Sequence, residues 1–435
     1  MTHGTATAHP HVSRVASHTS HTSHASHAGA EFAYPHGHLG ALSEREEEAL
    51  AKFKVLLEEK GYWKPGPPPS HDDATLLRFL RARRWVPEDA FGQFKDTEDW
   101  RQGNDVDVLY STIDLEAYEQ CRRLYPQWTG RRDRRGIPLY VFQVKNLDHK
   151  TVSEYEKHGA NNTFSEAKTD GKTPPNLLRL FALYENLTRF AMPLCTELKD
   201  REHAEAPITM STNIVDISGV GLKQFWNLKN HMQAASQLAT AHYPETLDRI
   251  FIIGAPYFFS TVWGWIKRWF DPITVSKIFV LSHSEVKPTL ESFIEPRNIP
   301  KKYGGELDYT FGELSVADPH WDGVITWENG YKSFPGGPLL WEDSEDGKSM
   351  TCYGLGVKDG KKRKEKICTL PKTYEAPAPK PTTNGVAKET EEKTEEAKPV
   401  ETVTNGEALE KLKINDEKKA EAASEVPQAQ TVTAA

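Results

Sequence analysis

The chain has 435 residues, enough for two or three domains, and a formal net charge of -8, which gives no indication of a nucleic-acid partner. Its four cysteines, Cys121, Cys195, Cys352 and Cys368, form no CxxC pair. Neither a zinc site nor a disulfide framework is therefore predicted, and a reducing compartment fits. The most apolar stretch, residues 250–259, is about half as long as a membrane-spanning helix, so we expect any membrane contact to be peripheral.

Both ends of the chain are poor in apolar residues. Residues 1–40 are dominated by His, Ser, Thr and Ala, and residues 371–435 by Lys, Glu, Thr, Ala and Pro. Such segments cannot bury enough apolar area to offset the loss of chain entropy on folding. We therefore expect two disordered tails, with the folded part between them.

Residues 41–130 predict a small helical domain. A first helix begins at Ser43, whose capping-box partner is Glu46, and ends at Gly61. The other helices are predicted to begin at Asp72 or Asp73 and to cover residues 87–101 and 115–123.

Residues 131–325 predict an α/β domain, because β-branched and aromatic runs alternate with helical stretches. Strands are predicted over residues 139–142, 209–217, 249–253 and 275–281. Helices are predicted over residues 176–190, 222–242, 259–269 and 285–293. The runs at 250–253 and 278–281 are apolar on both faces, as buried parallel strands are. We expect a mostly parallel sheet, a surface loop over 157–175 and a C-terminal extension over 326–370.

Three patterns in the sequence resemble enzyme or metal motifs but lack the residues that those motifs need. Cys195 and Arg201 have the spacing of a cysteine phosphatase, but the residues between them lack glycine and place two carboxylates at the phosphate. The run at 347–349 lacks the first glycine of a phosphate-binding loop. The histidine-rich N-terminus more simply keeps a tail solvated. No catalytic residue, metal site or cofactor is predicted.

Four segments, in this order, resemble the CRAL-TRIO lipid-binding family, in its branch of fungal phosphatidylinositol/phosphatidylcholine transfer proteins. The resemblance extends over residues 43–321. Its segments are DDATLLRFLRAR (72–83), HYPE (242–245) followed by IGAP (253–256), DPITVSKI (271–278) and IPKKYGG (299–305). It implies a helical N-terminal domain before a domain in which sheet and helices enclose a large hydrophobic pocket, with a bound phospholipid in place of a cofactor.

The resemblance assigns the phosphoinositol headgroup to Arg83, Glu245, Thr274 and Lys277. The chemistry agrees, since a buried phosphodiester needs cationic and hydroxyl donors and inositol hydroxyls need a carboxylate acceptor. The alternative is that Glu245 and Lys277 form an ordinary structural ion pair, with Arg83 a solvated charge.

A second headgroup position is matched less completely. Tyr140 and Ser211 fall on family positions, but Thr129 stands where an aromatic residue is typical and Asn213 where a threonine is. Part of an aromatic cage for choline is thereby lost. We therefore expect phosphatidylinositol as the main ligand, and phosphatidylcholine, a sterol or another apolar molecule as the second.

Residues 259–269 match the position of the family's mobile lid. An apolar stripe on this helix indicates either burial against a core or, with its tryptophans and with Lys267 and Arg268, a membrane interface. The gate residues are predicted to be Phe259, Val262, Trp263, Ile266, Trp269 and Phe270.

The resulting hypothesis is a monomeric, cytoplasmic, non-enzymatic carrier that associates peripherally with Golgi, endosomal or other internal membranes. It exchanges phosphatidylinositol between membranes or presents it to lipid kinases. A basic run at 361–364 is expected to strengthen contact with anionic lipid. The alternatives are a lipid-gated sensor or scaffold for a ligand such as a sterol, and an α/β enzyme that acts on a phosphorylated small molecule.

Overall fold

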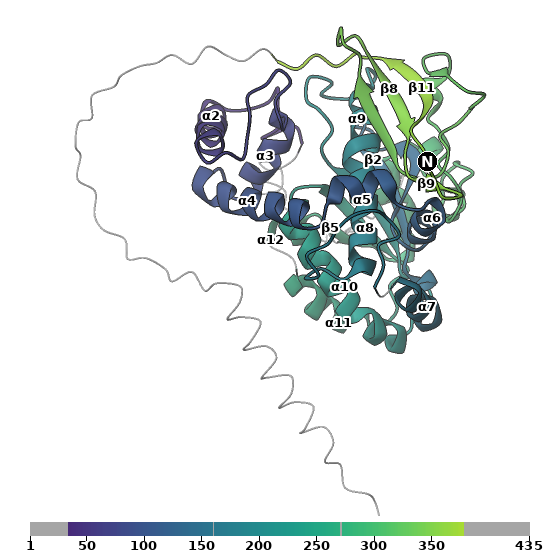
Figure 1. Cartoon of the computed structure of the whole chain (residues 1–435). Helices are drawn as coiled ribbons and strands as arrows, with labels where there is room; N and C mark the ends of the chain where they lie inside the picture. Colours follow the sequence, from purple (N-terminus) through teal and green to yellow (C-terminus); the bar gives the residue numbers. More distant parts are fainter. Residues whose placement is uncertain (1–33, 160, 270–271, 378–435) are drawn as a thin grey trace, which may run out of the picture. The chain divides into compact units, whose positions relative to one another are not determined.

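The computed structural model describes residues 34–159, 161–269 and 272–377 (Figure 1). Residues 1–33 and 378–435, most of the two expected tails, lie outside the described residues. None of the helices in the described part of the chain is long and apolar enough to cross a membrane.

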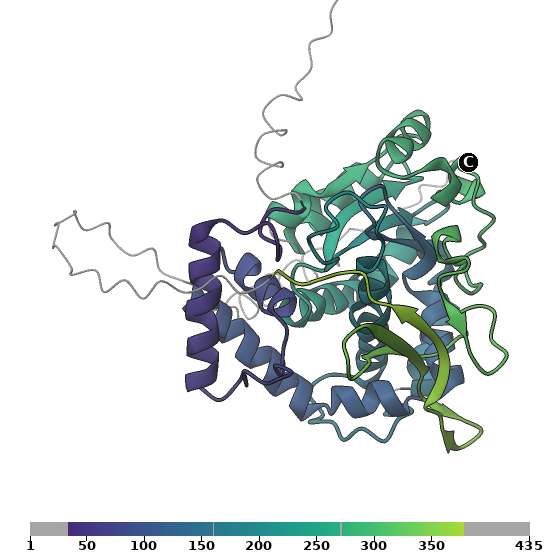
Figure 2. The same ribbon diagram turned by 90° about the horizontal axis from the view of Figure 1, so that it is seen from above.

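The N-terminal part is helical, as predicted, and Figure 2 shows its first helices as one purple and blue group. The Ser43 capping box is present, with the Ser43 amide 2.9 Å from Glu46 Oε2. Asp72 caps the second helix by accepting the Thr75 amide at 2.8 Å. The apolar faces meet in a core that includes Phe53 and Phe94. The helices are α2 (Glu44–Glu59), α3 (Asp73–Ala82), α4 (Pro87–Gly103), α5 (Val106–Thr112) and α6 (Leu115–Leu124).

A five-stranded sheet follows, in the order β1-β2-β3-β4-β5. The β1–β2 pair is antiparallel and every other pair is parallel, which confirms the expected mostly parallel sheet. Its strands are β1 (Gln127–Arg132), β2 (Pro138–Gln143), β3 (Ser211–Asp216), β4 (Leu247–Ile253) and β5 (Ile278–Val280). The sequence did not predict β1, whose polar residues are buried and paired: Arg132 Nε lies 3.0 Å from Asp318 Oδ2, and Gln127 Oε1 accepts the Tyr309 hydroxyl at 3.0 Å.

Helices cover both faces of this sheet. The predicted helix at 222–242 is confirmed residue for residue, whereas the predicted strand at 275–281 begins only at Ile278 because residues 272–276 are helical. The predicted loop at 157–175 begins inside helix α7. The helices are α7 (His149–Gly159), α8 (Pro175–Asn186), the π-helical turn η2 (Leu187–Ala191), α9 (Met192–Thr196), α10 (Leu222–His242), α11 (Phe259–Ile266), α12 (Pro272–Ser276) and α13 (His283–Phe293). The 3₁₀ turns are η1 (Val144–Asn146), η3 (Lys267–Trp269), η4 (Pro296–Asn298), η5 (Lys301–Tyr303) and η6 (Pro319–Trp321).

The C-terminal extension forms a sheet of its own, in the order β6-β11-β8-β7, beside α9 (Figure 1). Phe190, in η2, packs against Phe334 and stacks on Trp341, with ring centroids 4.9 and 6.0 Å apart. The strands are β6 (Thr326–Trp327), β7 (Leu339–Asp343), β8 (Ser349–Gly354) and β11 (Glu365–Pro371), with a small hairpin of β9 (Val357–Lys358) and β10 (Lys361–Lys362). The extension therefore shares a core with the α/β part.

The expected tails are too long by several residues at each end. Tyr34 is buried, and its hydroxyl donates to Ala206 O and accepts from Arg201 Nη1, both at 2.8 Å. At the other end, Thr373 Oγ1 donates to Glu197 O at 2.7 Å. Composition averages over a segment, so it hides a few residues with specific partners. Residues 34–40 and 372–377 belong to the folded part.

Candidate ligand-binding cavity

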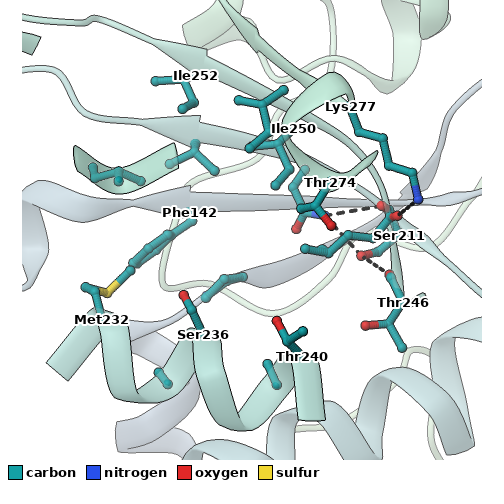
Figure 3. A pocket seen from close by; sticks show the side chains of 18 of the residues that line it. Phe142, Ser211, Met232, Ser236, Thr240, Thr246, Ile250, Ile252, Thr274 and Lys277 are labelled. Atoms are coloured by element: carbon teal, nitrogen blue, oxygen red, sulfur yellow. Dashed lines mark hydrogen bonds between the residues drawn. The ribbon is translucent and has the colours of Figure 1, made fainter. Parts of the chain in front are cut away.

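A cavity of about 460 Å³ lies between one face of the five-stranded sheet and helices α10 and α11 (Figure 3). Side chains alternate across a strand, so every second residue faces the cavity. On β4, Ile250 and Ile252 line it, whereas Phe251 and Ile253 belong to the core on the opposite face. The apolar run that predicted a buried strand therefore faces the cavity on one side of the sheet and the protein core on the other.

The cavity wall changes from polar to apolar along the strands. Near their N-terminal ends it carries Tyr140, Ser211 and Asn213; two residues further on it carries Phe142 and Val215. The parallel register places these residues in rows, because Tyr140 pairs with Asn213 and Phe142 with Val215. One end of the cavity can therefore hold a polar group while the other holds hydrocarbon.

Helix α10 continues this gradient on the facing wall. Met232, Ser236 and Thr240 are spaced by four residues and therefore lie on one helical face, which points into the cavity (Figure 3). The apolar member lies beside Phe142, and the hydroxyl members lie nearer the polar end. Both walls thus place their polar groups at the same end.

Lys277 and Glu245 meet at this polar end. Lys277 Nζ lies 3.3 Å from Glu245 Oε2 and donates to Leu247 O at 3.3 Å. The two side chains are 16% and 20% exposed, so water reaches the pair. Glu245 has a positive φ of 56°, a backbone conformation that costs energy for a residue other than glycine.

The other expected headgroup residues line the same cavity. Thr274, in α12, lies close to Lys277 (Figure 3). Arg83 is the C-cap residue of α3, and its side chain is exposed. Arg83 Nη1 donates to Ala82 O at 3.3 Å, a contact that leaves most of the guanidinium open. Segments far apart in the sequence thus bring Arg83, Glu245, Thr274 and Lys277 to one cavity.

The second headgroup position is already hydrogen-bonded. Ser211 Oγ donates to Thr246 O at 3.1 Å and accepts from Asn213 Nδ2 at 3.0 Å. Tyr140 is buried, and burial raises the pKa of its hydroxyl well above its usual value. Thr129 is fully buried within the sheet, where its hydroxyl donates to Leu139 O at 3.0 Å.

Four of the six expected gate residues line the cavity. Phe259 and Val262 are buried, and Trp263 stacks on Phe259 with ring centroids 6.2 Å apart. Ile266 completes this face. Trp269 ends the turn η3 and its side chain is not described, whereas Phe270 lies outside the described residues.

The opposite face of α11 is open to solvent. Trp265 is 39% exposed, and its ring lies 5.4 Å from that of Trp226 in α10, which is 48% exposed. Tyr257, just before α11, is 97% exposed. Lys267 and Arg268 follow on the same segment and are exposed. Helix α11 therefore presents apolar groups both inward and outward.

Two further residues, Arg81 in α3 and Gln93 in α4, line the cavity and were not predicted from the sequence. Burial lowers the pKa of Arg81 to about 10, and the nearby Glu245 carboxylate opposes this shift. Arg81 follows Leu77 by four residues and so lies on the apolar face of its helix, which was the available signal. Gln93, four residues after Asp89 in a helix of weak amphipathic pattern, gave no signal of this kind.

The basic run at 361–364, which is predicted to strengthen contact with anionic lipid, is largely paired with other groups of the chain. Lys362 and Lys364 lie 2.6 and 2.7 Å from the carboxylates of Glu166 and Glu342. Arg363 donates to Leu355 O at 3.1 Å and to Gly336 O at 3.2 Å. A β-hairpin spreads these cations over several partners, which sequence spacing alone does not show.

The structure also excludes the phosphatase interpretation of Cys195 and Arg201. Cys195 is buried in the core, and burial raises its thiol pKa to about 12, so it is no nucleophile. Arg201 binds the Tyr34 hydroxyl and neighbouring carbonyls. Among the described residues no group of three His, Cys, Asp or Glu side chains is arranged to hold a metal ion.

Comparisons with known proteins agree with this architecture. Residues 122–305 match the CRAL/TRIO domain, and residues 39–96 match the CRAL/TRIO N-terminal domain. The SEC14 cytosolic factor of Eremothecium gossypii is 30% identical over 278 residues, which cover 64% of this chain and 82% of that protein. The Sec14 cytosolic factor of Schizosaccharomyces pombe is 31% identical over 287 residues, 66% of this chain and 91% of that protein.

A plant relative extends the similarity. The phosphatidylinositol/phosphatidylcholine transfer protein SFH7 of Arabidopsis thaliana is 31% identical over 246 residues, 55% of this chain and 40% of that protein. Fold, cavity and sequence matches agree, and the chain belongs to the CRAL-TRIO family. The family prediction made from the four sequence segments is confirmed.

Proposed function

We propose that this chain binds one phospholipid in the cavity and exchanges it with membrane surfaces, with phosphatidylinositol as the favoured ligand. The observation that supports this most is one cavity with an apolar interior and a polar end that holds Lys277, Thr274 and Glu245. The similarity to a plant phosphatidylinositol/phosphatidylcholine transfer protein supports the same ligand class.

The energetics of lipid transfer require such a cavity. A phospholipid with about thirty methylenes gains roughly 25 kcal/mol on leaving water, at about 0.8 kcal/mol per CH₂. Spontaneous exchange through water is therefore negligible. A carrier whose interior is as apolar as a bilayer makes extraction nearly isoenergetic, provided that the headgroup is hydrogen-bonded as well as it was in water.

In this proposal Lys277, Thr274 and Arg83 hold the phosphodiester, and Glu245 accepts hydrogen bonds from inositol hydroxyls. The partial exposure of the Lys277–Glu245 pair supports this assignment over a structural ion pair, because both groups are open to an incoming ligand. On ligand binding, Lys277 then exchanges its carboxylate partner for a phosphate. Its hydrogen bond is charge-assisted with either partner.

Tyr140 and Ser211 are assigned to the headgroup of a second ligand. Because the Ser211 hydroxyl is already bonded at both its donor and an acceptor position, it offers less to the phosphate of a second lipid than Lys277 offers to that of the first. Phosphatidylcholine or a sterol is therefore proposed as the minor cargo. A sensor or scaffold that holds phosphatidylinositol for a lipid kinase is the alternative use of the same cavity.

The gate helix α11 is assigned to the membrane-facing opening, and Trp269 and Phe270, which follow it in the sequence, are assigned to the same gate. Exposed Trp265 and Tyr257 suit the headgroup depth of a bilayer, and Lys267 and Arg268 suit anionic lipid. We propose a monomeric, non-enzymatic carrier without a cofactor that acts in the cytoplasm and docks transiently on Golgi, endosomal or other internal membranes.

Each region of the chain has its own role in this proposal. A helical N-terminal domain (41–130) and the lipid-binding domain (131–325) enclose the ligand, the extension (326–370) packs against the lipid-binding domain, and residues 1–33 and 378–435 are not required for binding. Mass spectrometry of lipid extracted from the purified chain, with a liposome transfer assay for each lipid found, tests the function. A chain that retains and transfers no phospholipid would refute it.

A further inference from the structure

The short turn at residues 243–246 joins α10 to β4 and carries Glu245 at the polar end of the cavity. Glu245 has a positive φ of 56°. A residue other than glycine keeps such a backbone conformation only where its surroundings enforce it, and residues of this kind cluster at ligand-binding sites. The contacts that fix this turn therefore bear on what the carboxylate can bind.

Thr246 fixes the C-terminal side of the turn. It is buried, and its Oγ1 donates to Tyr243 O at 2.9 Å, which closes the turn across Glu245. Thr246 O accepts from the Ser211 amide at 2.9 Å and from Ser211 Oγ at 3.1 Å, and Figure 3 shows Thr246 beside Ser211. These bonds attach the turn to strand β3.

Tyr243 fixes the N-terminal side. Its ring is buried and stacks on Phe181 with centroids 5.4 Å apart, and its hydroxyl donates to Glu185 Oε1 in α8. Glu185 is itself held in place, because Arg101 Nη1 lies 2.7 Å and Arg189 Nε 2.6 Å from its carboxylate. Burial alone would raise the pKa of Glu185, but the two guanidinium groups outweigh it and lower the pKa to about 2. The acceptor of the Tyr243 hydroxyl is therefore a fixed, ionised group.

We propose that Tyr243 and Thr246 are positioning residues that hold the Glu245 carboxylate where the hydroxyl groups of a polyol headgroup meet it. This inference rests on the proposed function and deepens it. A carboxylate only accepts hydrogen bonds, so its preference for a polyol depends on where its oxygens lie. A turn that is fixed before the ligand arrives saves the cost of ordering it on binding. Glu185 does not line the cavity, so its effect on the ligand passes through Tyr243.

A competition between two anionic lipids measures polyol recognition apart from charge. Phosphatidylinositol and phosphatidylmethanol carry the same phosphodiester charge, but only the first has a polyol. The purified full-length chain is equilibrated with phosphatidylcholine vesicles that contain equal amounts of both lipids, and the lipid it takes up is measured by mass spectrometry. The ratio of phosphatidylinositol to phosphatidylmethanol is the readout.

Two variants each remove one contact of the turn. Tyr243→Phe keeps the stacked ring but loses the hydroxyl, and Glu185 keeps both of its arginines. Thr246→Val loses the bond that closes the turn. Each is expected to lower the ratio about threefold or more, because a displaced carboxylate makes weaker hydrogen bonds. The total amount of phospholipid held should stay close to that of wild type. If one variant does not fold, the other decides the question.

The same change in a Glu245→Ala chain separates positioning from a general loss of stability. Glu245→Ala alone should lower the ratio about tenfold or more, the effect of lost hydrogen bonds to a charged group. Adding Tyr243→Phe should then lower the ratio no further, although the melting temperature still falls, because effects that pass through one partner are not additive. A further fall in the ratio shows that Tyr243 acts independently of Glu245, and it overturns the inference. A Glu245→Ala chain with the wild-type ratio overturns the headgroup assignment and the inference together.

Tyr155→Phe is the matched control. Tyr155 is also buried, and its hydroxyl donates to Asn176 O at 3.1 Å, but it does not line the cavity. Its ratio should stay within about twofold of wild type. Unchanged ratios in both turn variants, or an equal fall in Tyr155→Phe, overturn the positioning role and leave the proposed function intact. A wild-type chain that takes up no phospholipid overturns both.

Discussion

Replacing Lys277 by alanine separates a lipid clamp from a structural ion pair. If Lys277 holds the phosphodiester, its loss removes a charge-assisted contact worth about 1.5 to 3 kcal/mol, which corresponds to a roughly 10- to 150-fold loss of affinity. If instead the pair with Glu245 stabilises the fold as a buried ion pair, its loss strands a carboxylate at a cost of about 3 to 5 kcal/mol of stability.

The structure favours the first outcome. Glu245 is 20% exposed and Lys277 16%, so water can solvate the remaining carboxylate. Fully exposed pairs contribute about 1 kcal/mol or less, and access of water moves this pair from the buried limit towards that one. We therefore expect Lys277→Ala to lower phosphatidylinositol transfer about tenfold or more, while the melting temperature changes little.

The assay compares transfer of phosphatidylinositol and phosphatidylcholine between liposomes with thermal unfolding of the same samples. Lys302→Ala is the control, because Lys302 Nζ lies 2.8 Å from Asp216, which is only 3% exposed, and neither residue lines the cavity. This control should lower the melting temperature without changing the ratio of the two cargoes. If Lys277→Ala behaves in the same way, with transfer of both lipids reduced alike, the headgroup assignment is wrong.

Three further predictions concern the gate, the chain ends and pH. Trp263→Ala should slow lipid exchange more than it lowers the amount of lipid held, whereas Trp265→Ala, on the exposed face, should weaken vesicle binding only; equal effects in both would contradict a gate. A chain limited to residues 34–377 should transfer lipid like the full chain, whereas residues 42–370 should melt at a lower temperature, because the Tyr34 and Thr373 contacts are lost; equal melting temperatures would show that these contacts do not contribute. His242 stacks on Trp100, and burial lowers its pKa to about 4. Between about pH 6.5 and 4, His242 is therefore protonated in the unfolded chain but neutral in the folded one. The free energy of unfolding should therefore fall by up to about 3 kcal/mol between pH 6.5 and 4. Denaturant titrations at several pH values should show that this fall is smaller in His242→Gln. An equal fall in the variant would assign the pH dependence to other groups.

The fold was predicted well where sequence periodicity reports burial directly. Strand β4 is enclosed on both faces, and helix α10 turns one face to the cavity along its length, so pattern and structure agree. Strand β1 was not predicted, because Arg132 and Gln127 are polar residues that are buried with partners more than a hundred residues away. A local pattern cannot contain such information.

The candidate site, like the fold, was predicted from the sequence only in part. Arg83, Glu245, Thr274 and Lys277 were found through a resemblance between motifs, and the structure places them all on one cavity. Arg81 and Gln93 were missed as cavity-lining residues, because Gln93 reaches the cavity through a contact between α4 and the end of α10, and Arg81 through contacts outside its own helix. Such a contact is visible only once the chain is folded.

The packing of the two regions has a consequence for how the cavity opens. Its apolar end is bounded by α11, which is short and exposed on its outer side, whereas its polar end is bounded by α3 and α4, which are fixed to α10 and to residues 34–40 by hydrogen bonds. Few buried contacts favour local opening, and many oppose it. Exchange should therefore begin with the acyl chains at the gate, while the headgroup contacts, formed by the more rigid end, are the last to break and set the selectivity.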